Sequence, residues 1–450
     1  MQLFYTQSTE YPPSFLPVVR VSPKDHSSIE NVVLETDAHG RPHIAWWARN
    51  NGRNAVFYRR GQTDAEPANH KPITIMERQS KTYSSPDSDS LRIKMDHLGN
   101  PYLVLAFEED DQTACYLVRS RSQGVSFETP TLISKQCVFA DATIDKSGTA
   151  HVAFVPYQGR LRGLRYRKIP GNTQPVDLVQ LVDDNRVIDV HIADGDGQVY
   201  IGYELGSFPP CGGRLGRPCE VKDVRLFQTH SLKGKDAFEA AEHIDVSSRA
   251  RIRAVEKSGR MHITFDETRG LKSRIVHADV EPGKTKAVSQ EIDKGCDPPF
   301  GVKIGYGSLG TVSNAGSAAF VVAGSGTPHI ASKVGDETIG YTIINRGISP
   351  QCQVVAEDKN AGNLKMDVDD SGRPHMIWRS HEGRNYIQER LLYSTIDPRG
   401  RFIDPIRIDA GRSGDKVAEI FFANISVVSG KDLSGKPEFF GFAQPLRDSR

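Results

Sequence analysis

The sequence has few cysteines, almost no net charge and no long apolar run. Its 450 residues include six cysteines, and no spacing between them matches the CxxC pairs of zinc sites. Lysine and arginine number 57 against 56 aspartate and glutamate residues, which removes the global electrostatic case for a nucleic-acid partner. No apolar stretch is long enough to span a membrane, and the first residues lack the basic-then-apolar pattern of a signal peptide.

The cysteines that are present carry a modest signal. Cys211 and Cys219 flank the Gly/Pro-rich segment CGGRLGRPC, so we expect a disulfide between them to order this loop. An even number of cysteines suits an oxidising compartment, which slightly favours a secreted or periplasmic protein. Six thiols in a chain of this length are also ordinary in the cytosol, so both compartments remain open.

One hairpin pattern recurs eight times along the chain. Each copy is an alternating apolar strand, a Gly-centred turn and a second alternating strand, as in ATIDKSGTAHVAFV. The turns repeat about every 56 residues and contain Gly40, Gly99, Gly148, Gly197, Gly259, Gly326, Gly372 and Gly435. Alternation with an Asp or Ser before the glycine predicts β-hairpins, because glycine accepts positive φ and the polar side chain bonds back to the turn.

A second hairpin follows each of the first seven copies, so a full repeat supplies four strands. The chain is therefore predicted to be all-β, a single eight-bladed β-propeller of four-stranded antiparallel blades over residues 1–450. The last copy has no second hairpin after it, and residues 1–22 look like a second hairpin with no first one before. We expect 1–22 and 418–446 to be the outer and inner hairpins of one closing blade, which leaves no free sheet edge. The alternative is a seven-bladed ring with an N-terminal arm.

The segment YLVRSRSQGVSFETP resembles the Asp-box of sialidases and related propellers, which reads Ser-x-Asp-x-Gly-x-Thr-Trp. Ser120, Gly124, Ser126 and Phe127 fit this box, whereas Ser122 stands in place of its Asp. A more degenerate version, STIDPRGRF, lies in the second hairpin of a later repeat. The resemblance implies a sialidase-like propeller architecture, in which the box is structural and lies away from the active centre. It does not extend to the sialidase catalytic residues, whose pattern has no match here.

Five histidines share one repeat position just after the turn: His43, His151, His262, His329 and His375. Histidine is a common metal ligand, but a shared register spreads these five around the ring instead of gathering them at one site. We therefore interpret them as a structural position and expect neither a metal site nor a cofactor. The acidic turns 194–197 and 367–372 are a minority case for calcium, because each offers few of the six or more oxygens that calcium takes.

The two faces of the predicted ring differ. The turns within hairpins share one face, called here the turn face, and they are short and repetitive. The segments that join hairpins share the other face, called here the loop face, and they include the irregular stretches 78–90, 205–223 and 294–316. Binding residues concentrate in irregular loops on a rigid scaffold. We therefore expect a glycan, another acidic ligand or a protein partner to bind the loop face.

Polar residues that follow the strands on the loop face are the candidate ligand-binding groups. Arginine forks suit carboxylate, sulfate or phosphate, and aromatic rings such as Trp47 can stack on sugars. Trp46 and Trp378 fit a blade core equally well. The candidate ligand-binding residues are Arg49, Arg53, Tyr157, Arg160, Arg269, Arg379 and Arg384.

Two classes of function remain open. The first is an enzyme acting on an acidic glycan, either a polysaccharide lyase with a cation and a Tyr or His base, or a glycoside hydrolase with two carboxylates. The candidate catalytic residues are Tyr157, Tyr203, Glu204, Asp266 and His381. The second class is a non-catalytic propeller, acting as a lectin or a protein-interaction scaffold. In either class we expect a monomer.

Overall fold

The computed structural model consists of β-strands, turns and loops. It describes residues 3–5, 13, 15, 19–23, 28–37, 41–50, 53–61, 71–79, 91–109, 112–156, 163–170, 175–179, 185–207, 222–233, 235, 237–246, 250–269, 272–292, 296, 319–323, 325–334, 338–345, 348–369, 371–382 and 388–408. This part of the chain contains no helix, and so none with the length and apolarity to cross a membrane.

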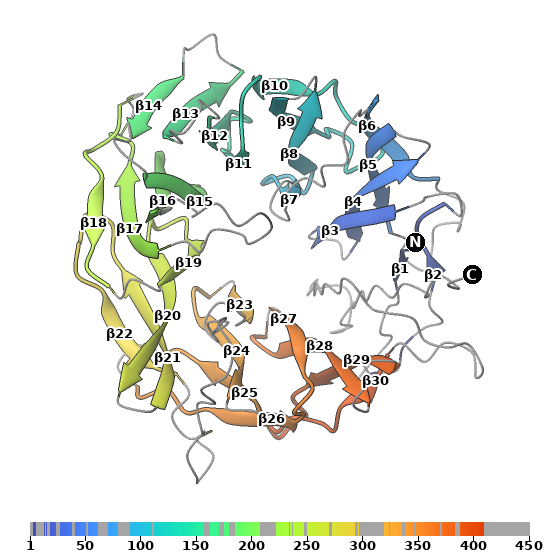
Figure 1. The fold of residues 1–450 in the computed structure, drawn as a ribbon, viewed down its shortest axis with the longest axis vertical. Helices are drawn as coiled ribbons and strands as arrows, with labels where there is room; N and C mark the ends of the chain where they lie inside the picture. Colours follow the sequence, from blue (N-terminus) through green and yellow to red (C-terminus); the bar gives the residue numbers. More distant parts are fainter. Residues whose placement is uncertain are drawn as a thin grey trace, which may run out of the picture.

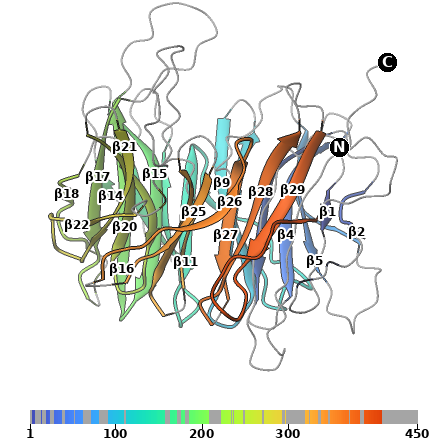
Figure 2. The ribbon, with the colours of Figure 1, turned by 90° about the horizontal axis from the view of Figure 1, so that it is seen from below.

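Seven four-stranded antiparallel sheets are arranged around a ring, with the first strand of each nearest the centre (Figure 1). Figure 2 shows the ring edge-on, with the strands running between its two faces. In chain order the sheets, called blades 1 to 7, are β3 (Ser28–Thr36), β4 (Pro42–Asn50), β5 (Arg53–Arg60) and β6 (Ile73–Gln79); β7 (Leu91–Met95), β8 (Pro101–Glu109), β9 (Gln112–Arg119) and β10 (Thr131–Ser134); β11 (Phe139–Ile144), β12 (Ala150–Val155), β13 (Leu164–Ile169) and β14 (Val176–Val179); β15 (Asn185–Gly195), β16 (Gln198–Ser207), β17 (Lys222–His230) and β18 (Glu242–Ile244); β19 (Arg251–Val255), β20 (Met261–Arg269), β21 (Lys272–Val280) and β22 (Val288–Glu291); β23 (Ala319–Val322), β24 (Pro328–Val334), β25 (Thr338–Ile343) and β26 (Gln353–Glu357); β27 (Gly362–Val368), β28 (Pro374–Glu382), β29 (Gln388–Thr395) and β30 (Ile406–Arg407).

The core lies between neighbouring blades, because both faces of each sheet carry apolar side chains. Trp47 of β4, for example, contacts Phe107 of β8, with ring centroids 4.6 Å apart. Trp46 and Trp378 are fully buried and Trp47 is nearly so. All three tryptophans therefore belong to the blade core, and none is exposed as a stacking surface for a sugar. The sequence had left this alternative open for Trp46 and Trp378.

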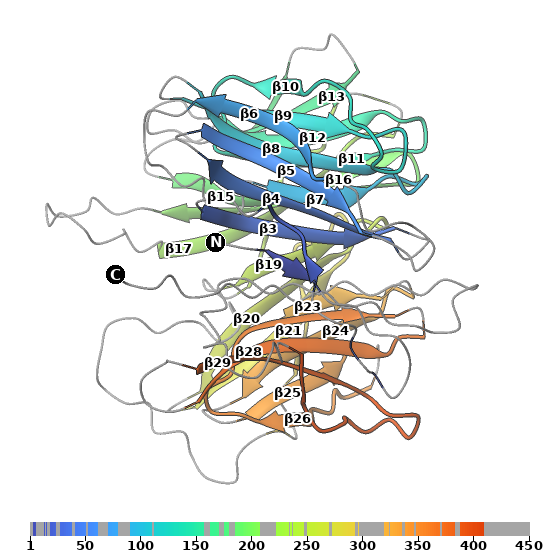
Figure 3. The same ribbon diagram turned by 90° about the vertical axis from the view of Figure 1, so that its right-hand side faces the viewer.

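The N-terminal residues form a separate two-stranded hairpin, β1 (Phe4–Tyr5) and β2 (Val19–Arg20). Leu3 and Val21 beside these strands pack into the blade 1 core. Phe15 packs against Tyr393 of blade 7. The hairpin thus contacts both blade 1 and blade 7, which Figure 3 shows above and below it.

The number of four-stranded blades within the described residues is seven, one fewer than the sequence predicted. The predicted inner hairpin of the eighth blade, residues 418–446, lies outside the described residues. The all-β architecture and the four-stranded repeat are confirmed. The eighth blade and the closure of the ring stay predictions.

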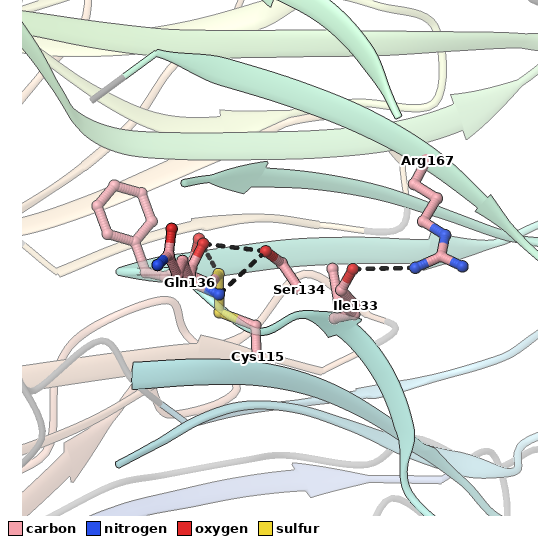
Figure 4. The surroundings of a disulfide bond; sticks show 7 residues. Cys115, Ile133, Ser134, Gln136 and Arg167 are labelled. Atoms are coloured by element: carbon pink, nitrogen blue, oxygen red, sulfur yellow. Dashed lines mark hydrogen bonds between the residues drawn. A yellow bond between two sulfur atoms is a disulfide. The ribbon is translucent and has the colours of Figure 1, made fainter. Parts of the chain in front are cut away.

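Among the described residues, two disulfides connect segments whose pairing the sequence does not predict. Cys115 in β9 bonds to Cys137, just before β11 (Figure 4), and Cys296 bonds to Cys352, just before β26. The first bond joins blade 2 to the start of blade 3. The segment 211–219, whose two cysteines were expected to pair, lies outside the described residues.

Candidate functional site

The five histidines of the shared repeat position are buried, and each bonds within its own blade. In blade 1, His43 Nδ1 lies 2.5 Å from the Tyr58 hydroxyl oxygen, and His43 Nε2 lies 3.2 Å from an Asp37 carboxylate oxygen. We call this arrangement of turn carboxylate, histidine and tyrosine a relay. Blades 3 and 7 have the same relay, Asp145–His151–Tyr166 and Asp369–His375–Tyr393. We also call two variants relays: Glu256–His262–His277 in blade 5, where a histidine replaces the tyrosine, and His329–Tyr341 in blade 6, which lacks the carboxylate. These contacts agree with a structural role.

An aromatic ring from the following segment of the ring covers the tyrosine of four relays. Phe127, in the Asp-box-like turn of blade 2, packs edge-on against Tyr58 of blade 1. The four contacts have centroid distances of 4.6 to 5.3 Å and comprise Phe127–Tyr58, Phe238–Tyr166, Phe402–Tyr341 and Phe15–Tyr393. The box-like turn therefore joins one blade to the next.

The boundary between blades 1 and 2 is closed over its relay. Gly124 of the box-like turn has a φ of 82°, and a Cβ placed on it would lie 1.8 Å from the Tyr58 hydroxyl oxygen. Arg41 donates hydrogen bonds to Asp37 and to the side-chain oxygen of Gln123 in the same turn. The turn thus fits against the relay so closely that only glycine is accommodated.

Charged side chains on the innermost strands bind one another across three blades. Arg92 of β7 pairs with Asp141 of β11 at 3.3 Å and with Asp189 of β15 at 3.0 Å. Lys94 pairs with Asp141 at 2.6 Å. Burial raises the pKa of Asp141, but the two cations outweigh burial and lower it. These charges neutralise one another near the centre of the ring. Little net charge is therefore left there to attract a ligand.

Tyr203 and Glu204, two of the candidate catalytic residues, are buried in blade 4. Tyr203 is 1% exposed and stacks on Phe227. Glu204 accepts hydrogen bonds from Arg251 at 2.8 Å and from the amide of Ile252 at 2.7 Å. Burial raises the pKa of Glu204, and the Arg251 guanidinium opposes that rise. Both positions favour packing and blade-to-blade contact over contact with a substrate.

A groove with a cavity volume of about 780 Å³ opens among the hairpin turns of blades 2 to 5, on the turn face. His151 and Tyr166 of the blade 3 relay line it. Blade 4 reaches blade 5 here, since a Cβ on Gly195 would lie 1.9 Å from the Lys257 carbonyl oxygen. The volume falls within the ordinary range of ligand sites. The sequence predicted a ligand on the loop face; most irregular stretches of that face lie outside the described residues, so the prediction is untested.

The carboxylate of Asp145 in this groove is held by its own turn. It accepts hydrogen bonds from the backbone amides of Ser147 and Thr149, both at 2.9 Å, and lies 3.1 Å from His151 Nε2. Burial raises the pKa of Asp145, but the hydrogen bonds from Ser147, His151 and Thr149 outweigh burial and lower it. Asp145 is therefore a carboxylate at neutral pH, with a fixed orientation toward the histidine.

Four lysines line the same groove, and three of them, Lys146, Lys235 and Lys257, come from three different blades. Lys146 comes from the first turn of blade 3, Lys235 from the second turn of blade 4 and Lys257 from the first turn of blade 5. Among the described residues, none of these three ammonium groups has an ion-pair or hydrogen-bond partner. They are thus available to an anionic ligand.

The predicted ligand-binding arginines that the structure describes do not line this groove. Arg49 and Arg53 lie together at the loop-face ends of β4 and β5, and the Arg53 side chain is 60% exposed. Arg379 is half-buried on β28, on the same sheet face as Ile377, which packs against Phe15. The side chains of Tyr157, Arg160, Asp266, Arg269, His381 and Arg384 lie outside the described part of the chain.

Sequence reasoning missed the groove lysines, although the repeat contained a signal for two of them. Lys146 and Lys257 occupy the same turn position, each in an acid-Lys-Ser-Gly turn. These turns belong to blades 3 and 5, on either side of the blade 4 turn 194–197. Alignment of the turns would have shown two equivalent lysines separated by one blade. Lys235, in a second hairpin, has no such signal.

No family model matches this sequence, and no curated protein matches it. Among solved structures, the chain is similar to an ulvan lyase of polysaccharide lyase family PL25, at 10% identity and a TM-score of 0.46 over 82% of this chain and 95% of the other. It is similar to the polysaccharide lyase Uly1 at 9% identity and a TM-score of 0.46, over 88% and 97% of the two chains. A puromycin-hydrolyzing peptidase of Mycobacterium tuberculosis aligns at 10% identity and a TM-score of 0.46, over 86% and 55%. Identities and TM-scores this low decide neither the function nor the blade count.

Proposed function

We propose that this protein is a carbohydrate-binding β-propeller that holds an acidic glycan in the turn-face groove. The observation that carries the proposal is the convergence of Lys146, Lys235 and Lys257, without partners among the described residues, on one cavity of about 780 Å³. Such an ammonium group gains a charge-assisted hydrogen bond when a carboxylate or sulfate binds. The three lysines come from different blades, so the site is single and asymmetric.

The mixed polarity of the groove supports a sugar over a simple inorganic anion. Four aspartates line it together with the lysines, namely Asp96, Asp145, Asp194 and Asp196. Carboxylate oxygens accept hydrogen bonds from hydroxyl groups, whereas ammonium groups donate them. A polyhydroxylated ligand that also carries carboxylates or sulfates uses both kinds of group. A small anion without hydroxyl groups would use only the lysines.

Calorimetry with polygalacturonate, alginate and chondroitin sulfate tests the proposal, with neutral dextran as the uncharged comparison. We expect an acidic polymer to bind and Lys146→Ala or Lys257→Ala to weaken binding roughly tenfold, the effect of losing one charged hydrogen bond. Lys135→Ala removes the same charge from an exposed residue outside the groove and is expected to leave binding unchanged. Equal weakening by all three substitutions, or binding to none of the acidic polymers, would refute the proposal.

We also propose that residues 1–22 are the outer hairpin of an eighth blade, which the C-terminal segment completes. Phe15 makes the same edge-on contact with Tyr393 that Phe402 makes with Tyr341, and that Phe127 makes with Tyr58. In the other two pairs the phenylalanine belongs to the second hairpin of the next blade. The equivalent position after blade 7 is therefore an outer hairpin of blade 8.

A further inference from the structure

The blade 3 relay lines the groove, and this feature distinguishes it from the equivalent relays of the other blades. His151 and Tyr166 are among the groove residues, and the His151 side chain is 9% exposed. The corresponding histidine side chains in the relays of blades 1, 5 and 7 are at most 1% exposed. The histidine of this unit is thus sealed in three blades and reaches a cavity in blade 3, where Tyr166, 3% exposed, also lines the cavity.

The contacts within this relay fix the direction in which a proton moves. Asp145 lies 3.1 Å from His151 Nε2 and, as a carboxylate, holds a proton on that nitrogen. His151 Nδ1 is then the acceptor for the Tyr166 hydroxyl, whose oxygen lies 2.6 Å away. A proton leaving Tyr166 passes to His151, and Asp145 stabilises the resulting imidazolium. Tyr166 then carries the negative charge of a base.

A cation beside Tyr166 is suited to the carboxylate of a uronate. Lys168 lies two residues after Tyr166 on the same face of β13, opposite His151 in the β12–β13 register, and lines the groove. A cation close to the uronate carboxylate stabilises the enolate-like charge that develops when the C5 proton leaves. The groove therefore places a proton acceptor and a carboxylate-binding group on the same wall.

Resting on the proposed glycan binding, we propose that Tyr166, positioned by His151 and Asp145, abstracts the C5 proton of a uronate residue bound in the groove. The electrons of the C5–H bond form a C4=C5 double bond, and the bond from C4 to the glycosidic oxygen breaks. The departing oxygen takes up a proton from the relay. One chain becomes two, one of which ends in an unsaturated uronate, and neither water nor an oxidant is consumed.

The test compares Tyr166→Phe with Tyr58→Phe, which removes the equivalent hydroxyl from the sealed relay of blade 1. Each variant is incubated with the polyuronate that binds, and unsaturated ends are followed by ultraviolet absorbance. We expect wild type and Tyr58→Phe to form product and Tyr166→Phe to lose at least about 100-fold in rate, with Kd unchanged within about twofold. Both variants lose one tyrosine–histidine hydrogen bond, so their Tm values should fall by similar amounts.

The outcomes separate the relay from the binding proposal. Binding without any unsaturated product from wild type overturns the relay and leaves glycan binding intact. Equal loss of product in both variants shows a structural role and also overturns the relay. Binding to none of the acidic polymers refutes the proposed function, and the relay falls with it; binding to chondroitin sulfate alone overturns the relay only. If Tyr166→Phe fails to fold, Asp145→Asn against Asp37→Asn repeats the comparison at the carboxylate, with the same expected contrast.

Discussion

The boundary between blades 1 and 2 and the boundary between blades 3 and 4 contain the same parts with different surroundings. Each has a turn carboxylate, a histidine, a tyrosine and a phenylalanine from the next blade. At the first boundary the Asp-box-like turn covers the relay, and Gly124 lies against Tyr58. At the second, the relay lines a cavity. The comparison teaches that a structural repeat becomes a candidate site where the neighbouring turns leave room.

The largest expected effect comes from filling the space at the closed boundary. Gly124→Ala puts a Cβ 1.8 Å from the Tyr58 hydroxyl oxygen at a φ of 82°, whereas Gly148→Ala meets open space at a φ of 83°. Backbone strain alone costs about 1–2 kcal/mol, and overpacking adds about 1–3 kcal/mol. We expect Gly124→Ala to lower the free energy of unfolding by about 2–5 kcal/mol and Gly148→Ala by about 1–2 kcal/mol in denaturant titrations. Equal losses would show that the boundary is not tightly packed.

The blade 6 relay has no carboxylate, so its buried histidine should resist protonation. The stability that this histidine contributes should therefore depend on pH. His329 has no turn carboxylate bonded to it, and burial lowers its pKa to about 4. The unfolded imidazole takes up its proton near pH 6.5, so the stability contributed by neutral His329 is lost as pH falls from about 6.5 to 4. In His329→Gln no side chain titrates at this position, so this loss of stability does not occur. The stability difference between wild type and the variant should shrink by roughly 3 kcal/mol across that window; a constant difference would contradict the prediction.

The N-terminal hairpin should behave like the outer hairpins of the other boundaries. Phe15 and Phe402 are half-buried and make similar edge-on contacts with a relay tyrosine. We expect Phe15→Ala and Phe402→Ala each to lower the free energy of unfolding by about 2 kcal/mol, below the range for a fully buried ring. A loss at Phe402 with none at Phe15 would make residues 1–22 a loose arm instead of part of a blade.

The smallest effect is expected from restoring the missing aspartate of the Asp-box-like turn. The Ser122 hydroxyl accepts a hydrogen bond from the Ser126 amide at 2.9 Å. A carboxylate in its place accepts the same bond and makes it charge-assisted. Ser122→Asp should therefore raise the free energy of unfolding by up to about 1 kcal/mol, measured as a small rise in Tm. A fall in Tm would show that this turn has adapted to serine.

Much of the fold was predictable because its information is local. The alternating strands and the Gly-centred turns specify hairpins within a few residues, so the four-stranded repeat was found without reference to any other blade. The interpretation of the shared histidine position also agrees with the structure, since each of the five histidines bonds within its own blade. The loop-face residues Arg49 and Arg53 are expected from the sequence to follow strands, whereas Arg49 lies within β4 and Arg53 begins β5. Their binding role stays a prediction.

What only the tertiary structure decided lies between blades. The sequence determined the strands, the turns and the relay residues, because hydrogen bonds within a hairpin join neighbours in the chain. It did not determine that Cys115 bonds to Cys137, that Arg92 reaches Asp189 two blades away, or that the blade 3 relay opens into a groove. Those outcomes depend on how closely separate hairpins approach, and that distance is set by packing across the whole ring, which no single repeat specifies.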